Sequence, residues 1–494
     1  MTTKTKTKTA SKLKPPPKAV TVPGKTSPKK LNATEKKSLT WFEDRIKDAR
    51  KQGADAIEVA AKAFRDMTEA FHQIREQKLY RETHETFEDY FRDKWDFGRS
   101  HANRLADTGE LIERLSSHGE ILKLMTMESH FRPLTGLGAE QQNQIIETAQ
   151  TWLGFANDRS VAPALIRTAK VFVLPPESGA LPDPQKAEIV SKVTEFVEAA
   201  EAKLPKGTSS DVRKLFAQLK KQTADLSRPR SGTGISWTDD TWNPLQGCTH
   251  VSKGCDRCYA AKFVATRAKH RYPGLAKKTI VKERPTYNFL GKIMLLPELL
   301  GQPLQERTPK LYFVNSMSDL FHKNVPDDFI EAVFEVMKKA HWHRFQVLTK
   351  RPERMAVFTK TYFNGSKPPE NVWLGATAED QEAYDDRIKF LRDTTAAVRW
   401  LSCEPLLGPI KFDSAKGIEW VVVGGESDSI RPMKKEWATS LRDQCKNADI
   451  PFFFKQWGSF NEEGEGPQKE DHSDTTPPTL DGKIHREWPQ IPGG

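Results

Sequence analysis

Short apolar segments of β type recur through the second half of the chain, each followed by a longer segment with helical spacing. Six of these runs are KLYFVNS, RFQVLTK, NVWLGAT, VRWLSCE, EWVVVGGE and PFFFKQW, and successive runs end 22 to 34 residues apart. One strand with its crossover helix takes about 30 residues, and continuous apolar strands are typical of parallel sheets covered by helices. The sequence therefore predicts an α/β fold, a partial (β/α) barrel over residues 233–460, with a short first strand at 236–242.

Each apolar run ends in polar or glycine residues. Because the carboxyl ends of barrel strands converge on one face, we expect these residues to build a single site. The candidates are Asn315, Ser318, Asp319, Lys350, Arg351, Cys403, Glu404, Gly424, Gly425 and Glu426. Lys350 and Arg351 could pair with a cofactor carboxylate or a substrate phosphate, but a solvated helix start would explain them equally well.

Three of the five cysteines, Cys248, Cys255 and Cys258, lie within eleven residues in a C-x6-C-x2-C pattern just before the first clear strand. Thiolates select zinc or iron–sulfur clusters. Structural zinc takes four ligands, and His250 could supply the fourth. Three thiolates on a cubane cluster instead leave one iron open, where S-adenosylmethionine can bind and be split to a 5′-deoxyadenosyl radical. Among the other thiols, Cys403 could be a fourth ligand or a radical relay, but a buried structural role is favoured.

The first half of the chain is largely helical. A helix over 83–95, a break at Asp96–Gly98 and a second helix from Arg99 or Ser100 form a helix-turn-helix pattern. In such a unit the second helix enters a major groove, and its exposed N-terminal residues lie near the bases. Those residues are Arg99, His101, Asn103 and Arg104. Helical pairs that only build a bundle are the commoner alternative.

Charge and composition divide the rest of the chain. Residues 1–40 carry eleven Lys and one acid, and the whole chain has a net charge of +11. We expect a disordered basic arm at 1–36, an all-α domain at 37–170, a linker with helices at 171–232 and a disordered tail at 461–494. The arm could also contact a polyanion.

Several classes of protein are excluded by the sequence. No apolar run approaches the roughly 18 residues of a membrane helix, and the N-terminus lacks a secretory apolar region. Five cysteines do not make a disulfide framework, so a reducing cytoplasm is expected.

The α/β half resembles a known family. The segments WTDDTWNPLQGCTHVSKGCDRCYA, YFVNSMSDLFHKNVP, FQVLTKRPERM, NVWLGATAEDQ, RWLSCEPLLGPI, WVVVGGESDSIRPM and PFFFKQWG are similar to a phage-associated three-cysteine-motif family, which resembles a divergent branch of the radical S-adenosylmethionine superfamily. The helical half resembles phage and plasmid partition-type DNA-binding modules over residues 80–170.

The resemblance implies a [4Fe-4S] cluster on Cys248, Cys255 and Cys258, and it implies that the GGE turn at 424–426 holds the methionyl amine of S-adenosylmethionine. Tyr259 is a further cofactor-binding candidate, and the SCEP turn at 402–405 is a rival for the amine. The chain departs from the superfamily pattern, because the usual spacing is C-x3-C-x2-C and the usual GGE lies on the second strand.

The expected function is a radical S-adenosylmethionine enzyme of phage origin that acts on DNA or another nucleic acid, by modification or repair-like chemistry. Catalytic candidates are Cys403, Glu404 and Asp319. The alternative is a non-catalytic DNA-binding protein with a structural zinc or iron–sulfur site. A third possibility is that the helical half binds a partner protein.

Overall fold

The computed structural model describes residues 58–115, 120–174, 235–281, 284–427, 431–466 and 477–489. The chain divides into compact units at 1–60 and 61–494, and nearly all described residues belong to the second. The predicted basic arm and most of the predicted linker at 171–232 lie outside the described residues. In the described parts, no helix combines the length and apolar character needed to span a membrane.

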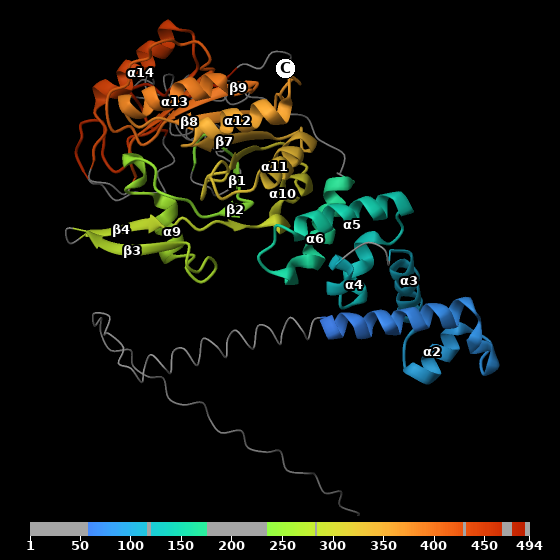
Figure 1. The fold of residues 1–494 in the computed structure, drawn as a ribbon. Helices are drawn as coiled ribbons and strands as arrows, with labels where there is room; N and C mark the ends of the chain where they lie inside the picture. The colour runs from blue at the N-terminus through green and yellow to red at the C-terminus, as the bar shows by residue number, and fades with distance from the viewer. Residues whose placement is uncertain are drawn as a thin grey trace, which may run out of the picture. The chain divides into compact units, whose positions relative to one another are not determined.

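The N-terminal part of the described chain is helical (Figure 1). After a helical stretch at 58–76, its elements are η1 (Leu79–Glu82), α2 (Phe87–Trp95), α3 (Arg99–Leu115), η2 (Glu120–Leu124), α4 (Glu128–Phe131), η3 (Arg132–Leu134), α5 (Ala139–Leu153), η4 (Arg159–Val161) and α6 (Ala162–Val173). α6 continues past the predicted domain end at residue 170.

The predicted helix, turn and second helix are present as α2 and α3. α2 begins at Phe87 and not at residue 83, because the Thr86 hydroxyl accepts from the Asp89 backbone N–H and caps the helix. The helix stops at Asp96, whose φ of 57° is left-handed. The chain then enters α3 at Arg99, within the predicted start.

A seven-stranded parallel sheet forms the centre of the second half, and it curls into a half barrel. Its strand order is β1-β6-β7-β8-β9-β10-β11, so neighbours follow chain order. The strands are β1 (Asp240–Trp242), β6 (Leu311–Val314), β7 (Arg344–Thr349), β8 (Val372–Thr377), β9 (Val398–Cys403), β10 (Trp420–Gly424) and β11 (Phe452–Gln456). This confirms the predicted α/β class and partial barrel, preceded by helices.

Helices connect consecutive strands from β6 to β9 and again between β10 and β11, as a parallel sheet requires (Figure 1). They are α11 (Asp327–Lys339), α12 (Pro352–Phe363), α13 (Gln381–Asp393) and α14 (Lys435–Asn447). Between β1 and β6 the chain adds β2 (Leu245–Gln246), η5 (Lys253–Cys255), α9 (Tyr259–Thr266), β3 (Ala276–Val281), β4 (Arg284–Phe289), β5 (Met294–Leu295), η6 (Pro297–Leu299) and α10 (Gln302–Gln305).

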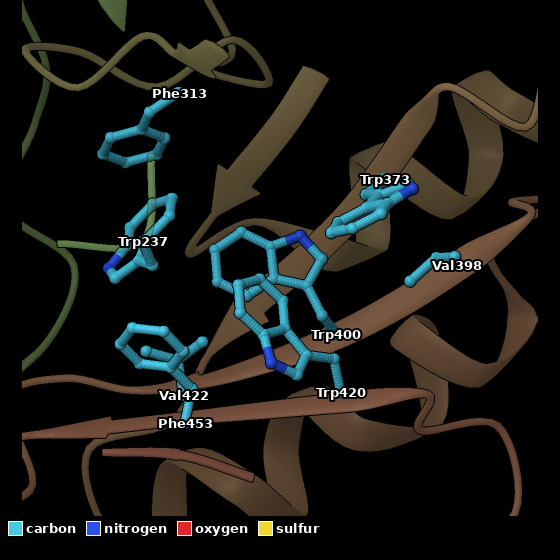
Figure 2. Packing of buried hydrophobic residues seen from close by; sticks show 8 residues of the cluster. All are labelled: Trp237, Phe313, Trp373, Val398, Trp400, Trp420, Val422 and Phe453. Atoms are coloured by element: carbon cyan, nitrogen blue, oxygen red, sulfur yellow. The ribbon is translucent and has the colours of Figure 1, made fainter. Parts of the chain in front are cut away.

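Aromatic side chains pack together inside the curl of the sheet (Figure 2). Trp237, Trp373, Trp400 and Trp420 are at most 2% exposed, and burial of side chains this large is worth about 2–3 kcal/mol each. Gly375 leaves room for the indole, since a Cβ there would lie 2.4 Å from Cε2 of Trp400. This apolar layer supports the polar ends of the same strands.

The last described segment adds to the sheet. Arg486 bridges to Phe453 of β11 in antiparallel sense, and Trp488 stacks on Trp420 with ring centroids 5.1 Å apart. Residues 477–489 therefore differ from the predicted disordered tail at 461–494. The acidic, Pro-rich composition of the tail predicts disorder, but its one tryptophan, Trp488, packs on the aromatic core.

Candidate functional site

The segment from Cys248 to Cys258, called here the cysteine loop, lies at the carboxyl edge of the half barrel, where the parallel strands end. Cys248 follows β2, and its Sγ is 3.8 Å from Nη1 of Arg351, the residue two positions past β7. Nη2 of Arg351 donates to the Thr249 carbonyl oxygen at 3.1 Å. Cys255 ends η5 and Cys258 is the N-cap of α9. The structure thus brings the thiol loop and a strand-end cation together.

The three thiols are the donor type that a thiolate-bound metal group takes, and all three lie on the cysteine loop. Burial raises the pKa of Cys248 to about 12, with a small contribution from Cys258, and burial likewise raises the pKa of Cys258, with a contribution from Cys255. His250, the predicted alternative ligand, contacts Asp256 instead, with Nε2 and Oδ1 2.8 Å apart.

As placed, no three His, Cys, Asp or Glu side chains of the described residues lie close enough together to hold a metal ion. Binding a cluster therefore requires the loop to draw its three sulfurs together. A bound cation would offset the cost of burying the Cys248 and Cys258 thiolates, because metal binding displaces the thiol protons.

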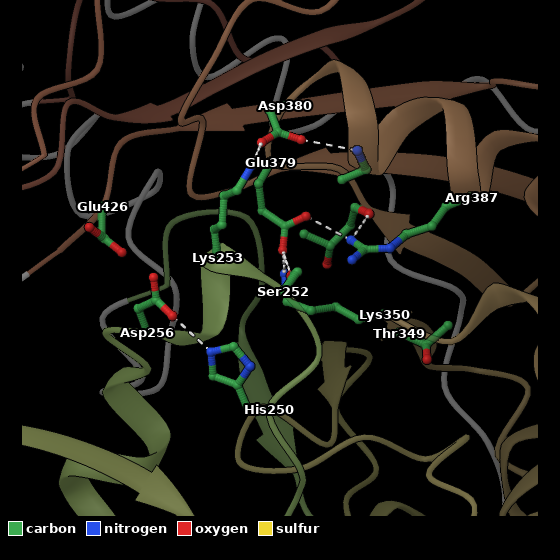
Figure 3. Close-up of polar contacts among 12 residues, drawn as sticks. His250, Ser252, Lys253, Asp256, Thr349, Lys350, Glu379, Asp380, Arg387 and Glu426 are labelled. Atoms are coloured by element: carbon green, nitrogen blue, oxygen red, sulfur yellow. Dashed lines mark hydrogen bonds and ion pairs between the residues drawn. The ribbon is translucent and has the colours of Figure 1, made fainter. Parts of the chain in front are cut away.

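Glu379, just past β8, anchors the loop to the sheet (Figure 3). Its buried carboxylate accepts from the Ser252 hydroxyl, from Nζ of Lys350 at 2.5 Å and from Nη1 of Arg387 at 2.7 Å. Burial alone would raise its pKa, but Lys350 and Arg387 outweigh it and lower the pKa to about 2. Gly254 leaves the space that this carboxylate fills, since a Cβ would lie 2.4 Å from Oε1.

Asp319 joins the ends of β6 and β7. Its Oδ2 accepts from Nη1 of Arg351 at 2.5 Å, and its Oδ1 accepts from the Thr349 hydroxyl at 2.7 Å. Ser318, its neighbour, donates to the Leu245 carbonyl oxygen at 2.9 Å. Three of the predicted residues, Asp319, Ser318 and Arg351, therefore connect the ends of β6 and β7 to each other and to β2.

Asn315 occupies a different setting at the end of β6. It is 2% exposed, its φ is 60°, and neither Oδ1 nor Nδ2 has a hydrogen-bond partner. A buried amide without partners costs free energy unless a ligand or water satisfies it. Asn315 is therefore the predicted residue best suited to bind a small polar group.

Arg431 connects the GGE turn to the cysteine loop. Its Nε donates to Oε2 of Glu426 at 2.7 Å and its Nη2 to Oε1, while Nη1 and Nη2 also reach Oδ2 of Asp256 and the Lys253 carbonyl oxygen, at 3.2 and 3.1 Å. The Arg431 guanidinium thus links the GGE turn after β10 to the cysteine loop through hydrogen bonds.

The glycines of the GGE turn have packing reasons of their own. A Cβ on Gly425 would lie 1.9 Å from the Trp457 carbonyl oxygen, and one on Gly424 would lie 2.6 Å from Oε1 of Glu404. Glu404 accepts from Nζ of Lys455 at 2.8 Å. The turn therefore allows β10 and β11 to end in close contact.

Cys403 and Tyr259 are placed differently from one another. Cys403 is fully buried in β9, where burial raises its pKa well above its usual value, and Cys445 is among its neighbours. Tyr259 is 52% exposed at the start of α9, and its hydroxyl donates to the Ser316 carbonyl oxygen at 2.5 Å. Tyr259 therefore lies at the edge, and Cys403 packs in the core.

The predicted groove-contacting residues of α3 are largely engaged with carboxylates. Nδ2 of Asn103 donates to Oε1 of Glu88 at 3.0 Å, and Nε of Arg99 is 3.7 Å from the same oxygen. Nε of Arg104 is 3.6 Å from Oε1 of Glu128. These pairs neutralise much of the positive charge at the start of α3.

His101 completes the predicted set. Its ring lies edge-on to Phe97, with centroids 5.0 Å apart. The four α3 residues and the thiols come from separate elements, and no contact joins the two groups among the described residues.

Three edge residues were missed by sequence reasoning: Glu379, Arg387 and Arg431. Glu379 stands two positions past a strand and could have been found by extending the strand-end search. Arg387 lies on α13 and Arg431 follows β10 by seven residues, so no strand-end pattern marks them.

Comparison with known proteins identifies the family of the α/β half. No curated protein and no solved structure matches the chain. The family described as "Protein of unknown function (DUF5131)" matches residues 232–489, which include the whole half barrel, the cysteine loop and the segment carrying Trp488. This match covers more than half of the 494 residues, and the chain therefore belongs to the DUF5131 family.

Proposed function

We propose that the chain is a radical S-adenosylmethionine enzyme that binds a [4Fe-4S] cluster through Cys248, Cys255 and Cys258 and acts on nucleic acid. The observation that carries the proposal is the attachment of a three-thiol loop to the carboxyl edge of a parallel half barrel, where such folds place their sites. When bound, the cluster would supply the electron that cleaves the sulfonium of S-adenosylmethionine.

The residues of this chain would act by holding and orienting. Glu379 fixes the loop through Ser252, and Arg431 fixes its other side through Asp256. Arg351 places positive charge beside Cys248, which favours the thiolate that a metal needs. The free amide of Asn315 would donate to and accept from a polar cofactor group.

Anaerobic purification tests this function. We expect a brown protein containing iron and sulfide, which releases 5′-deoxyadenosine from S-adenosylmethionine after reduction. Cys255→Ala should lose most of the iron. Val251→Ala, an exposed change in the same loop, should keep it. A colourless protein, or full iron content in Cys255→Ala, would contradict the proposal.

A second candidate is a structural zinc or cluster site in a non-catalytic DNA-binding protein. The pairing of the strand-end cations favours it. Lys350 and Arg351 already bind Glu379 and Asp319, the positions that a cofactor carboxylate or a substrate phosphate would otherwise take. Stoichiometric zinc in the same preparation, with no cleavage of S-adenosylmethionine, would support it.

A further inference from the structure

The segment that follows the cysteine loop is strongly basic. Residues 259–292 contain nine Lys or Arg and a single acid, Glu283. The segment contains α9 and the antiparallel pair β3–β4, which is a separate two-stranded sheet (Figure 1). We call the described residues 259–281 and 284–292, which include α9 and β3–β4, the basic ribbon. Such a density of one charge attracts a polyanion.

A small apolar core gives the basic ribbon its shape. Val264 and Ala268 of the α9 segment pack with Tyr272 and Leu275, and Phe289 of β4 and Met317 pack against them. Met317 lies just past β6, so this core joins the ribbon to the carboxyl edge of the half barrel. The ribbon is therefore built as a supported element beside the candidate site.

The ribbon also bonds directly to the cysteine loop. The backbone N–H of Gly291 donates to the Cys248 carbonyl oxygen at 3.1 Å. Gly247, the residue before Cys248, packs against the same backbone, since a Cβ there would lie 2.1 Å from the Lys292 carbonyl oxygen. The C-terminal end of the ribbon therefore lies next to the start of the cysteine loop.

Four cations of the ribbon are exposed and form no ion pair with the part of the chain that the structure describes. Arg267, Lys269, Lys277 and Lys278 are all exposed, and none of them forms an ion pair with the described residues. Lys277 stands opposite Asn288 and Lys278 opposite Tyr287, so the two lysines face opposite sides of the pair. This contrasts with Arg99 and Arg104 in α3, which meet carboxylates.

Exposed apolar side chains lie on the same segment. Tyr259 and Phe263 of α9 are 52% and 41% exposed, and Ile280 of β3 is 63% exposed. Aromatic rings among cations are suited to stacking on bases, and a two-stranded ribbon has the width to enter a major groove. Both features favour nucleic acid over an acidic protein.

We propose that the basic ribbon is the nucleic-acid-binding surface of this chain: Lys277, Lys278 and Arg267 contact phosphates and deliver the strand to the cysteine loop. This inference rests on the proposed function for the identity of the substrate. It places the main contact on the α/β half and not on α3.

Fluorescence anisotropy with labelled duplex and single-stranded DNA over a range of salt tests the inference. Lys277→Ala/Lys278→Ala should weaken binding about tenfold and lower the slope of log Kobs against log salt by about 2. The charge-matched control Lys360→Ala/Lys446→Ala, with exposed lysines on α12 and α14, should change neither. Circular dichroism verifies that both variants are folded.

The outcomes separate this inference from the proposed function. Unchanged DNA binding in Lys277→Ala/Lys278→Ala overturns the ribbon, and so does equal binding of polyglutamate or of anionic lipid vesicles. Iron content and 5′-deoxyadenosine release are measured in the same wild-type preparation. Their absence would refute the cluster while leaving a salt-dependent ribbon intact.

Discussion

The carboxyl edge of the half barrel and the start of α3 both pair cations with carboxylates, but they bury them differently. At the edge, the side chains of Glu379 and Arg387 are 1% and 10% exposed. At α3, Glu128 is 9% exposed, but its partner Arg104 is 46% exposed. A pair with both members buried fixes geometry, whereas a pair with an exposed arginine can open at little cost. The ion pairs at the carboxyl edge can therefore hold the cysteine loop in a fixed position, whereas the pair at α3 does not fix its arginine.

The largest effect is expected at the edge. Glu379→Ala leaves Lys350 and Arg387 buried without their carboxylate, and the free energy of unfolding should fall by about 3–5 kcal/mol. Glu382→Ala removes an exposed carboxylate nearby, whose partner is the exposed Lys253, and should cost under about 1 kcal/mol. Urea titration measures both. Similar losses in the two variants would remove the distinction between buried and exposed pairs.

A pH titration should give the next largest effect. The pKa of Glu379 is lowered to about 2 from a usual 4.5, so its contribution to stability is complete above pH 4.5 and is lost as the pH falls toward 2. The loss over that range should be about 3 kcal/mol. Glu379→Gln should lack this part of the acid dependence. If the free energy of unfolding falls equally with pH in wild type and Glu379→Gln, Glu379 is not the group responsible for the acid dependence.

The smallest effect is expected at α3. Arg104→Ala should lower stability by under about 1 kcal/mol, because Glu128 keeps Arg132 at 2.8 Å. If α3 reads DNA, as its sequence pattern predicts, the same variant weakens DNA binding. A loss in Arg104→Ala that exceeds the loss in Lys277→Ala/Lys278→Ala would return the main contact to α3.

The alternating pattern of the second half was sufficient to predict the half barrel, because apolar strands and helical crossovers each leave a local signal. The strand-end candidates Asp319, Lys350 and Arg351 followed from the same logic. Their partners did not, because Ser252 and Glu379 are 127 residues apart and meet only through the order and curl of the strands. Trp488 was missed since one aromatic residue in a polar tail carries no periodic signal.

The basic ribbon was also visible in the sequence as a run of lysines and arginines, but charge alone does not identify a surface. What distinguishes it from α3 is that Lys277 and Lys278 form no ion pair with the described residues, and that depends on tertiary packing. In the sequence, charge pointed to the N-terminal arm and the helix-turn-helix pattern pointed to α3, whereas in the described residues Lys277 and Lys278 beside the cysteine loop form no ion pair.

The strand order begins at β1 and ends at β11, and these two strands do not pair with each other. The inside of the curl is filled by Trp237, Trp373, Trp400 and Trp420, so no polymer passes through it, whether the sheet is open or closed. A molecule that meets this fold therefore meets it at the strand ends, where an internal position of a continuous strand is as accessible as its terminus.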